Sequence, residues 1–333
     1  ISTLTNNSGG VLNNYNLLAN NGGTLNNDGL IVNHTSGTLT NGAGGTLNNN
    51  STLNNGGTLN NNGTLNSNSV LVNHGTLNNN VTLNLNNNSL INQNLGTLNN
   101  VGSLNASTNL ENSGVLTNNI GGTLTNTGEL HNTGTLINYG TFDNNGLLRH
   151  YDGTITNRSG STLRNTGSLT NYVNATLILD AGGTFDNTGG TLSNSGTIKL
   201  YQDLALGSVN AGTVNLNANG TLNNYANLSV IGGHTQTNHG ALTNRSGSAL
   251  NNAGILNNYG TLTLDAGGTF DNTGGTLYNK SGGTIKLYQD LALGSATAGT
   301  VNLNSGSTLN NYANLSIIGG HTQTNGGKLT NQV

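Results

Sequence analysis

The sequence predicts an all-β fold, a parallel β-solenoid (β-helix) with about 18 to 20 residues per coil. Three observations lead to this class. A six-residue motif close to Gly-Thr-Leu-Asn-Asn recurs along the 333 residues, only 6% of the residues are charged, and 52 are Gly, whereas Pro, Cys, Met and Trp are absent. An ordinary globular domain has about a quarter of its residues charged, so the repeat rather than the composition must explain how this chain folds.

The spacing of the leucines defines the strands. In runs such as Leu59 to Leu83 and Leu98 to Leu116, each apolar position follows the last by six residues. Six is a multiple of the two-residue period of a strand and does not fit a helix, so each motif shows the same alternation of side chains. Within residues 57–62, we therefore expect Gly57, Leu59 and Asn61 to point inward, and the intervening Thr and Asn to point outward.

Stacking of coils explains how so few apolar residues can form a core. Leu on Leu would form a thin continuous core, and inward Asn on Asn would form amide ladders that also bond the backbone at the bends. The short strands are separated by Gly and Asn, which tolerate positive φ, so the chain can bend between them. Steps of seven and eight residues between apolar positions favour a right-handed coil, although the strict six-residue run from Leu59 to Leu83 is also typical of left-handed hexapeptide helices.

A longer duplication lies over the short repeat. The segment that contains Asp180 returns at Asp265, 85 positions later, and the segment at Tyr201 returns at Tyr288, 87 positions later. Residues 176–260 and 261–333 thus contain a long internal duplication. This length is about four coils, so the duplication adds coils without disturbing the stack, and we predict a single continuous solenoid over residues 1–333.

The two segments 185–192 and 270–277, both Phe-Asp-Asn-Thr-Gly-Gly-Thr-Leu, carry a family resemblance. They resemble the degenerate repeats of filamentous-haemagglutinin-type, autotransporter-like β-helix adhesins. This resemblance implies a right-handed parallel β-helix, export across a Gram-negative outer membrane, and a role in adhesion or biofilm. The protein is then expected to be secreted, extracellular or at the bacterial cell surface.

The tyrosines are the candidate residues for ligand binding. Several follow an apolar position and one or two Asn, so exposed rings could stack on sugar rings, while packing of each ring over a corner of the next coil is the alternative. The candidate glycan-stacking residues are Tyr139, Tyr172, Tyr225, Tyr259 and Tyr312.

Enzymatic and metal-binding readings have little support in the sequence. Polysaccharide-processing β-helix enzymes need clustered carboxylates, and we interpret the candidate aspartates here as solvated or turn-capping residues rather than as such a cluster. These candidates are Asp180, Asp186, Asp203, Asp265, Asp271 and Asp290. His234 and His321 recur about four coils apart, too far to share a metal. We predict no catalytic, cofactor-binding or metal site and no enzyme activity.

An ice-binding solenoid is the other alternative, because Thr-apolar-Thr triplets could form outward Thr rows. They are scattered among Thr-Leu-Asn versions, which would break the array. The triplets contain Thr38, Thr40, Thr123, Thr125, Thr154, Thr156, Thr261 and Thr263. Glycosylation sequons also occur, at Asn105, Asn157, Asn174, Asn227 and Asn244, as expected from composition alone.

The charge balance and the terminal repeats bear on partners. A net charge of -3 with eight Lys plus Arg leaves no basic patch for nucleic acid, and no run of about 20 apolar residues could span a membrane. Both terminal segments follow the repeat, so Leu4 and Leu329 are candidate stacking residues. They would join copies head-to-tail into a homo-oligomer or filament, or continue into coils of a longer adhesin.

Overall fold

The computed structural model describes residues 2–87, 89–318 and 325–332. The chain divides into two compact units. Unit 1 contains residues 1–169 and 182–184, and unit 2 contains residues 170–181 and 185–333. Within the described residues, regular structure consists of short strands and one 3-10 helix, η1 (Val209–Ala211), and no helix is long and apolar enough to cross a membrane.

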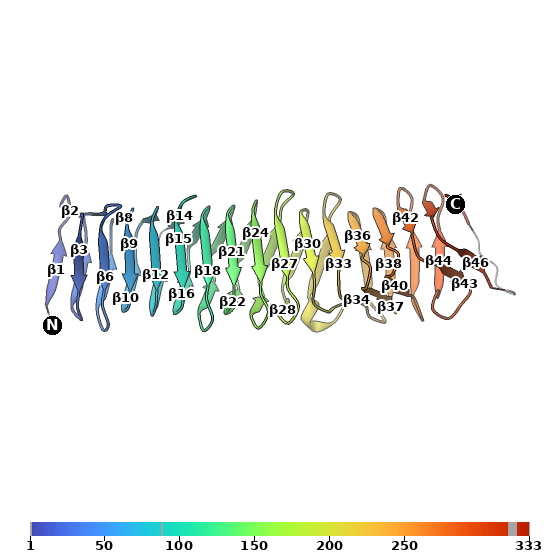
Figure 1. The fold of residues 1–333 in the computed structure, drawn as a ribbon, viewed down its shortest axis with the longest axis horizontal. Coiled ribbons are helices and arrows are strands. Elements are labelled where there is room, and N and C mark those ends of the chain that lie inside the picture. Colours follow the sequence, from blue (N-terminus) through green and yellow to red (C-terminus); the bar gives the residue numbers. More distant parts are fainter. Residues whose placement is uncertain (1, 88, 319–324, 333) are drawn as a thin grey trace. The chain divides into compact units, whose positions relative to one another are not determined.

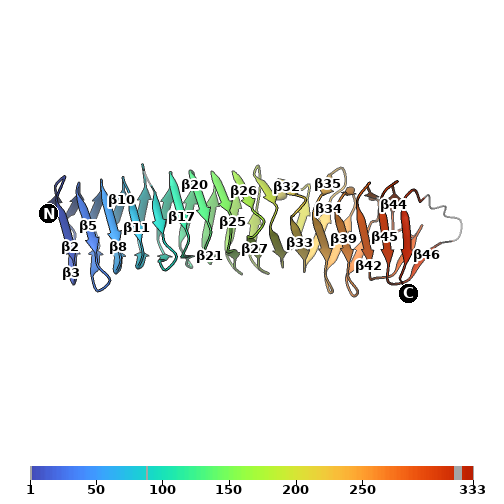
Figure 2. The same cartoon turned by 90° about the horizontal axis from the view of Figure 1, so that it is seen from above.

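Unit 1 is built from three parallel sheets, which we call A, B and C (Figures 1 and 2). Sheet A contains β1 (Thr3–Asn6), β4 (Thr24–Asn27), β7 (Thr46–Asn49), β10 (Thr64–Ser67), β13 (Thr82–Leu85), β16 (Ser103–Ala106), β19 (Thr123–Asn126), β22 (Thr141–Asn144) and β25 (Thr162–Asn165). Sheet B contains β2 (Val11–Asn14), β5 (Leu30–Asn33), β8 (Thr52–Asn55), β11 (Leu71–Asn73), β14 (Leu90–Asn92), β17 (Asn109–Asn112), β20 (Glu129–Asn132) and β23 (Leu147–His150). Sheet C contains β3 (Leu17–Asn20), β6 (Thr38–Asn41), β9 (Thr58–Asn61), β12 (Thr76–Asn79), β15 (Thr97–Asn100), β18 (Val115–Asn118), β21 (Thr135–Asn138) and β24 (Thr154–Asn157).

Unit 2 repeats this plan in sheets that we call D to G. The division between the two units falls within β26 (Ser168–Asn171) and again within β28 (Thr184–Asp186). Sheet D contains β31 (Leu204–Leu206), β34 (Asn227–Val230), β37 (Ala249–Asn252) and β40 (Thr269–Asp271), and sheet E contains β43 (Leu291–Leu293) and β46 (Leu315–Ile317). Sheet F contains β29 (Thr191–Asn194), β32 (Thr213–Leu216), β35 (Thr235–Asn238), β38 (Ile255–Asn258), β41 (Thr276–Asn279) and β44 (Thr300–Leu303). Sheet G contains β27 (Thr176–Leu179), β30 (Thr197–Leu200), β33 (Thr221–Asn224), β36 (Ala241–Asn244), β39 (Thr261–Leu264), β42 (Thr284–Leu287), β45 (Thr308–Asn311) and β47 (Lys328–Asn331).

Strand pairing confirms the parallel β-solenoid. In most of the described coils a strand pairs in parallel with the strand three elements later, so one coil contributes one strand to each side. Thr46 pairs with Thr64 across a short coil, whereas Thr197 pairs with Thr221 across a longer one. The predicted length of about 18 to 20 residues describes the shorter coils, and longer turns account for the rest. Right-handedness and continuity through both units stay predictions.

The inward and outward positions are also as predicted. Gly57, Leu59 and Asn61 are buried, and the intervening Thr58 and Asn60 are partly exposed. Leu59 lies in register with Leu on both neighbouring strands of sheet C, at positions 39 and 77. Each coil therefore covers the leucine of its neighbour, which is how a chain with 32% hydrophobic residues buries a continuous apolar core.

The predicted amide ladders occur at the strand ends. The Nδ2 of Asn61 donates to Oδ1 of Asn79 at 2.8 Å and to the carbonyl of Thr82 at 2.6 Å, and Nδ2 of Asn79 donates in turn to Oδ1 of Asn100 at 2.7 Å. Each inward Asn thus joins two coils and also holds the backbone where the next strand begins. These bonds provide partners for polar groups that would otherwise be buried without any.

Gly and Asn both tolerate positive φ, but at the described bends Gly alone adopts it. No described residue other than Gly has positive φ, so the Asn residues do not adopt it. Gly57 does not have positive φ either, although Gly44 does, with φ of 69°. A Cβ atom at Gly57 would collide with the carbonyl oxygen of Gly37 in the neighbouring coil. The glycine before Thr-Leu is therefore required by the close approach of two backbones rather than by its φ.

Candidate binding surfaces

The predicted tyrosines lie on different sides of the coils rather than in one row. Tyr139 follows β21 of sheet C, Tyr172 follows β26, and Tyr259 follows β38 of sheet F. Tyr225 and Tyr312 follow β33 and β45, both of sheet G. Tyr225 and Tyr312 therefore share one corner of unit 2, whereas Tyr172 and Tyr259 follow strands of another sheet, the one that contains both β26 and β38. Whether any of these residues binds a glycan stays a prediction.

Tyr225 and Tyr312 each stack on a tyrosine of the preceding coil. The ring centroids of Tyr201 and Tyr225 are 4.6 Å apart with the planes at 12°, and those of Tyr288 and Tyr312 are 4.5 Å apart at 10°. Each ring covers one face of its partner, and about 37 to 40% of each residue is exposed. The sequence pattern did not single out Tyr201 and Tyr288 as ring partners, because each partner lies one long coil away and coil length varies.

These two pairs belong to a longer surface feature, which we call the tyrosine column. It comprises the residue that directly follows each of seven strands of sheet G, from β27 to β45. Its members are Asp180, Tyr201, Tyr225, Arg245, Asp265, Tyr288 and Tyr312. Nη1 of Arg245 lies 3.4 Å from Oδ2 of Asp265, and its guanidinium carbon lies 5.9 Å from the Tyr225 ring centroid. The column thus alternates stacked rings with an ion pair.

The surroundings of the column change the acidity of two phenols. Burial raises the pKa of Tyr201 above its ordinary value, with smaller contributions from Tyr225 and Asp180. Burial likewise raises the pKa of Tyr288, followed by the effects of Tyr312 and Asp265. Both hydroxyls therefore stay protonated at neutral pH and are available as hydrogen-bond donors and acceptors at the surface.

Tyr139 and Tyr259 have different neighbours. Tyr139 lines a shallow, open concavity in unit 1 together with Val101 and Ile120, and Ile120 is 81% exposed. Tyr259 is 44% exposed and stacks on His239, with centroids 5.1 Å apart and planes at 17°. Tyr172 is half-buried. Tyr139 is thus part of an apolar patch, whereas Tyr259 supports another ring.

The candidate aspartates have local hydrogen bonds that fit turn-capping. Oδ1 of Asp271 accepts from the backbone N–H of Thr273 at 2.9 Å and from its hydroxyl at 2.6 Å, and these bonds hold the pKa of Asp271 below its ordinary value. Asp186 makes the same two contacts with Thr188. Among the residues that the structure describes, no three His, Cys, Asp or Glu side chains form a group that could hold a metal.

The remaining aspartates also have partners near their own corners. Asp203 and Asp290 each accept a backbone N–H from the next coil, and Asp265 pairs with Arg245. His234 lies at a crevice in sheet F, whereas His321 falls outside the described residues. Among the Thr-apolar-Thr triplets, Thr125 has Asn105 and Asp143 as its register partners, so this outward Thr row is broken as predicted.

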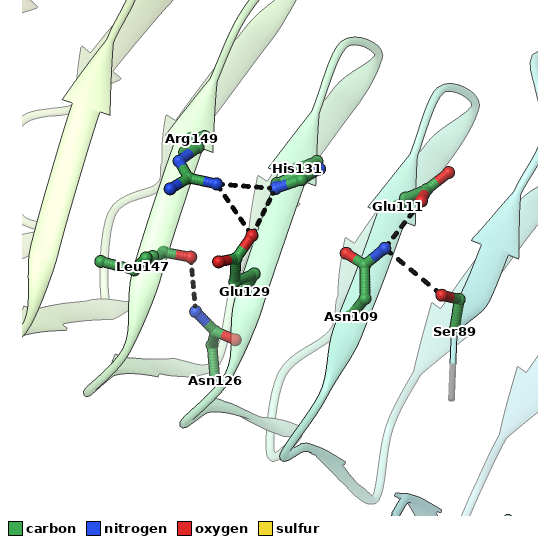
Figure 3. A network of polar contacts seen from close by, with 8 residues as sticks. All are labelled: Ser89, Asn109, Glu111, Asn126, Glu129, His131, Leu147 and Arg149. Carbon is green, nitrogen blue, oxygen red and sulfur yellow. Dashed lines mark hydrogen bonds and ion pairs between the residues drawn. The ribbon is translucent and has the colours of Figure 1, made fainter. Parts of the chain in front are cut away.

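A charged network in unit 1 was not predicted from the sequence (Figure 3). Oε2 of Glu129 lies 2.8 Å from Nη1 of Arg149 and 3.0 Å from Nε2 of His131, and these side chains are about a third exposed. Glu111 precedes His131 in the same outward register column of sheet B. The sequence indicates this network only weakly, because one must know the length of each coil to say which outward charged residues are neighbours.

The candidate stacking residues Leu4 and Leu329 lie in β1 and β47 and are each 49% exposed. Leu4 is in register with Leu25, and Leu329 with Leu309. Both therefore occupy the leucine position of the repeat. Among the described residues, each of the two leucines has a neighbouring coil on one side.

Comparisons with known proteins agree with the repeat. The haemagglutinin-repeat family profile matches residues 2–43, 24–75, 61–134, 190–294 and 289–333, which together span more than half of the chain. Among solved structures, the crystal structure of a TibC-catalysed hyper-glycosylated TibA fragment aligns with 99% of this chain and 97% of that chain. It has 15% identity and a TM-score of 0.28, and at that score the likeness carries no further inference. No curated protein matches the sequence.

Proposed function

Because the chain belongs to the haemagglutinin-repeat family, we propose that it is a non-catalytic adhesive β-helix protein that is exported to the bacterial cell surface or beyond it. The observation that carries the proposal is the tyrosine column, in which four tyrosines, each about 37 to 40% exposed, stack in pairs on a stack of short strands. Aromatic residues with a polar tip are favoured at binding surfaces because they bury large area at little entropic cost.

The exposed edges and hydroxyls of the column fit a carbohydrate or another polar cell-surface ligand. The stacked pairs present their ring edges, since the inner faces cover each other and the Arg245 guanidinium lies over the Tyr225 ring. Arg245 and Asp265 between the pairs supply charged donors and acceptors. Such a surface can bind a polar chain that runs along the column through several weak contacts, whose combined strength exceeds that of each contact.

Binding of the purified chain to cells or to a glycan array tests the proposal. We expect binding that falls at least several-fold when Tyr225 and Tyr312 are both changed to Ala. Tyr15→Ala is the matched control, because Tyr15 is an exposed corner tyrosine of unit 1 that stacks on His34. Absence of binding by the unchanged protein, or equal binding by the double variant, would refute an adhesive role for the column.

Head-to-tail association is a second proposal and concerns Leu4 and Leu329. Each is half exposed at the apolar position that elsewhere is covered by the next coil, so stacking of one copy on another would bury it. Electron microscopy of the 333-residue chain should show filaments that Leu4→Asp abolishes. Monodisperse monomers at high concentration would contradict this proposal.

The same preparations test the two alternatives named by the sequence. An ice-binding protein would shape ice crystals at micromolar concentration, and a polysaccharide-processing enzyme would release unsaturated ends from acidic glycans. We expect neither result, because the outward Thr row is broken beside Thr125 and the candidate aspartates have local turn-capping bonds.

A further inference from the structure

Sheet F contains an interruption between β32 and β35, which are neighbours in the sheet order (Figure 2). These strands share the single register pair Leu216 and Asn238. By contrast, β29 pairs with β32 over four residues, and so does β35 with β38. The two coils therefore separate along most of this side while each stays fully paired with its other neighbour.

The residue at the interruption is Gln236, which occupies the inward position where β38 has Leu256. Gln236 is 4% exposed, and its Nε2 donates to the carbonyls of Val214 and Thr237, both at 3.1 Å. In regular coils a strand carbonyl accepts a backbone N–H, as Asn6 accepts from Asp28. Here the side-chain amide occupies the Val214 carbonyl, because a buried amide needs partners that the leucine core does not offer.

The separation leaves a crevice of about 410 Å³, within the size range of small-molecule sites. Its polar lining residues include Thr213, Asn215, Asn217, Thr235, Thr237 and the two histidines His234 and His239. All residues that line it are described, and none has a carboxylate, an ammonium or a guanidinium group. The lining thus offers hydroxyl, amide and imidazole groups, which suit a ligand that both donates and accepts hydrogen bonds but carries no charge.

One wall of the crevice is aromatic. His239 lines the crevice and stacks on Tyr259, so one face of its ring is covered by Tyr259. The backbone N–H of His239 donates to the carbonyl of Leu216 at 3.0 Å, which fixes the residue beside the last paired position of the two strands. A supported ring at the edge of a hydrogen-bonding crevice can stack on the apolar face of a sugar.

We propose that the crevice between β32 and β35 is a binding subsite for an uncharged, polyhydroxylated ring, that is, a neutral sugar unit. This proposal deepens the adhesive function and rests on it for its biological role. An anion would find no lysine or arginine and only the imidazoles of His234 and His239, a metal would lack carboxylates, and an apolar ligand would leave the threonines and the amides without partners. The sequence of residues 232–238 recurs at 319–325, and Asn325 bridges Leu303 as Asn238 pairs with Leu216.

Two variants separate binding from folding. Gln236→Leu restores the leucine of the repeat, so we expect β32 and β35 to pair fully, the protein to resist urea better, and sugar binding to fall at least tenfold. His239→Ala removes the aromatic wall and should weaken binding several-fold without closing the crevice. His74→Ala is the control, because His74 is an exposed corner histidine of sheet B in unit 1.

The probes are the methyl glycosides of galactose, glucose, mannose and N-acetylglucosamine, with glucuronate as the charged comparison. Amide chemical shifts of residues 235–239 are followed by NMR during titration of the full chain, and millimolar affinity is expected for one sugar unit. No shift with any neutral glycoside, stronger binding of glucuronate, or unchanged binding by both variants would overturn the proposal. Cell binding without these shifts refutes only the crevice, whereas shifts without cell binding refute only the adhesive function.

Discussion

Asn78 and Asn79 are adjacent residues of β12 that both belong to amide ladders, so together they test what burial contributes to a ladder. Asn78 points outward and donates to Oδ1 of Asn60 at 2.9 Å. Asn79 points inward, is fully buried, and donates to Oδ1 of Asn100 at 2.7 Å and to the carbonyl of Ser103 at 2.8 Å. Replacing each by Ala removes the same atoms from the same strand.

The expected costs differ because water reaches only one ladder. Asn79→Ala leaves the buried Oδ1 of Asn100 without this donor and the buried Nδ2 of Asn61 without this acceptor, and each buried polar group without a partner costs about 1 to 3 kcal/mol. The variant should therefore lose about 2 to 6 kcal/mol of unfolding free energy, with a further contribution from the cavity. At Asn78, water can replace the lost bonds, so Asn78→Ala should cost about 0.5 kcal/mol.

Urea denaturation followed by circular dichroism measures the two costs, and amide hydrogen exchange locates them. Exchange should accelerate in β9, β12 and β15 of the Asn79 variant, because a solenoid loses stability locally between neighbouring coils. Equal losses for the two variants, or a loss below about 1 kcal/mol for Asn79→Ala, would refute the view that the inner ladders stabilise the fold.

Three further predictions concern the core, the close backbone approach and pH. Leu104→Asp should cost about 4 kcal/mol or more in urea denaturation, because a carboxylate in this thin core has no partner, whereas Ser103→Asp on the outward side should cost less than about 1 kcal/mol. Gly57→Ala should cost about 3 kcal/mol, since the new Cβ would meet a carbonyl of the neighbouring coil, and a cost near zero would contradict the packing argument. Asp271 has a pKa below its ordinary value of 3.8, chiefly through the Thr273 hydroxyl and then its N–H, so it contributes stability above pH 3.8 that is lost as the pH falls through its lower folded-state pKa. Asp271→Asn keeps the acceptor without titrating, so its urea midpoint should fall less than that of the unchanged protein between about pH 4 and pH 2.

The sequence predicts the interior of this protein better than its surface. The six-residue spacing around Leu59 and Asn61 is enough to place both residues inward. Side chains alternate between the two faces of a strand, and only one choice of inward face covers the leucines. The amide ladders follow for the same reason, since inward Asn in stacked coils must find another amide. Thus the repeating part of the fold is a local property of the motif.

Surface neighbours depend on the length of each coil, which the motif does not determine. Tyr201 stacks on Tyr225 only because a long coil separates them, and Glu129 meets Arg149 only because the coil between them is shorter. The crevice depends on Gln236, a single departure from the leucine position whose effect on pairing requires the structure to be seen. Sequence reasoning therefore named Tyr225 and Tyr312 but not the rings that cover them, and it considered His234 without the crevice.

The uneven pairing in sheet F has a mechanical consequence. In a stack of coils, backbone hydrogen bonds run along the stacking axis, so a pulling force on unit 2 is carried by one coil boundary after another in series. Most boundaries resist through four register pairs in each strand pair, as between β35 and β38, whereas sheet F offers one pair between β32 and β35. Under tension sheet F should therefore begin to open at this boundary, beside Gln236, before the fully paired boundaries between β29 and β32 and between β35 and β38.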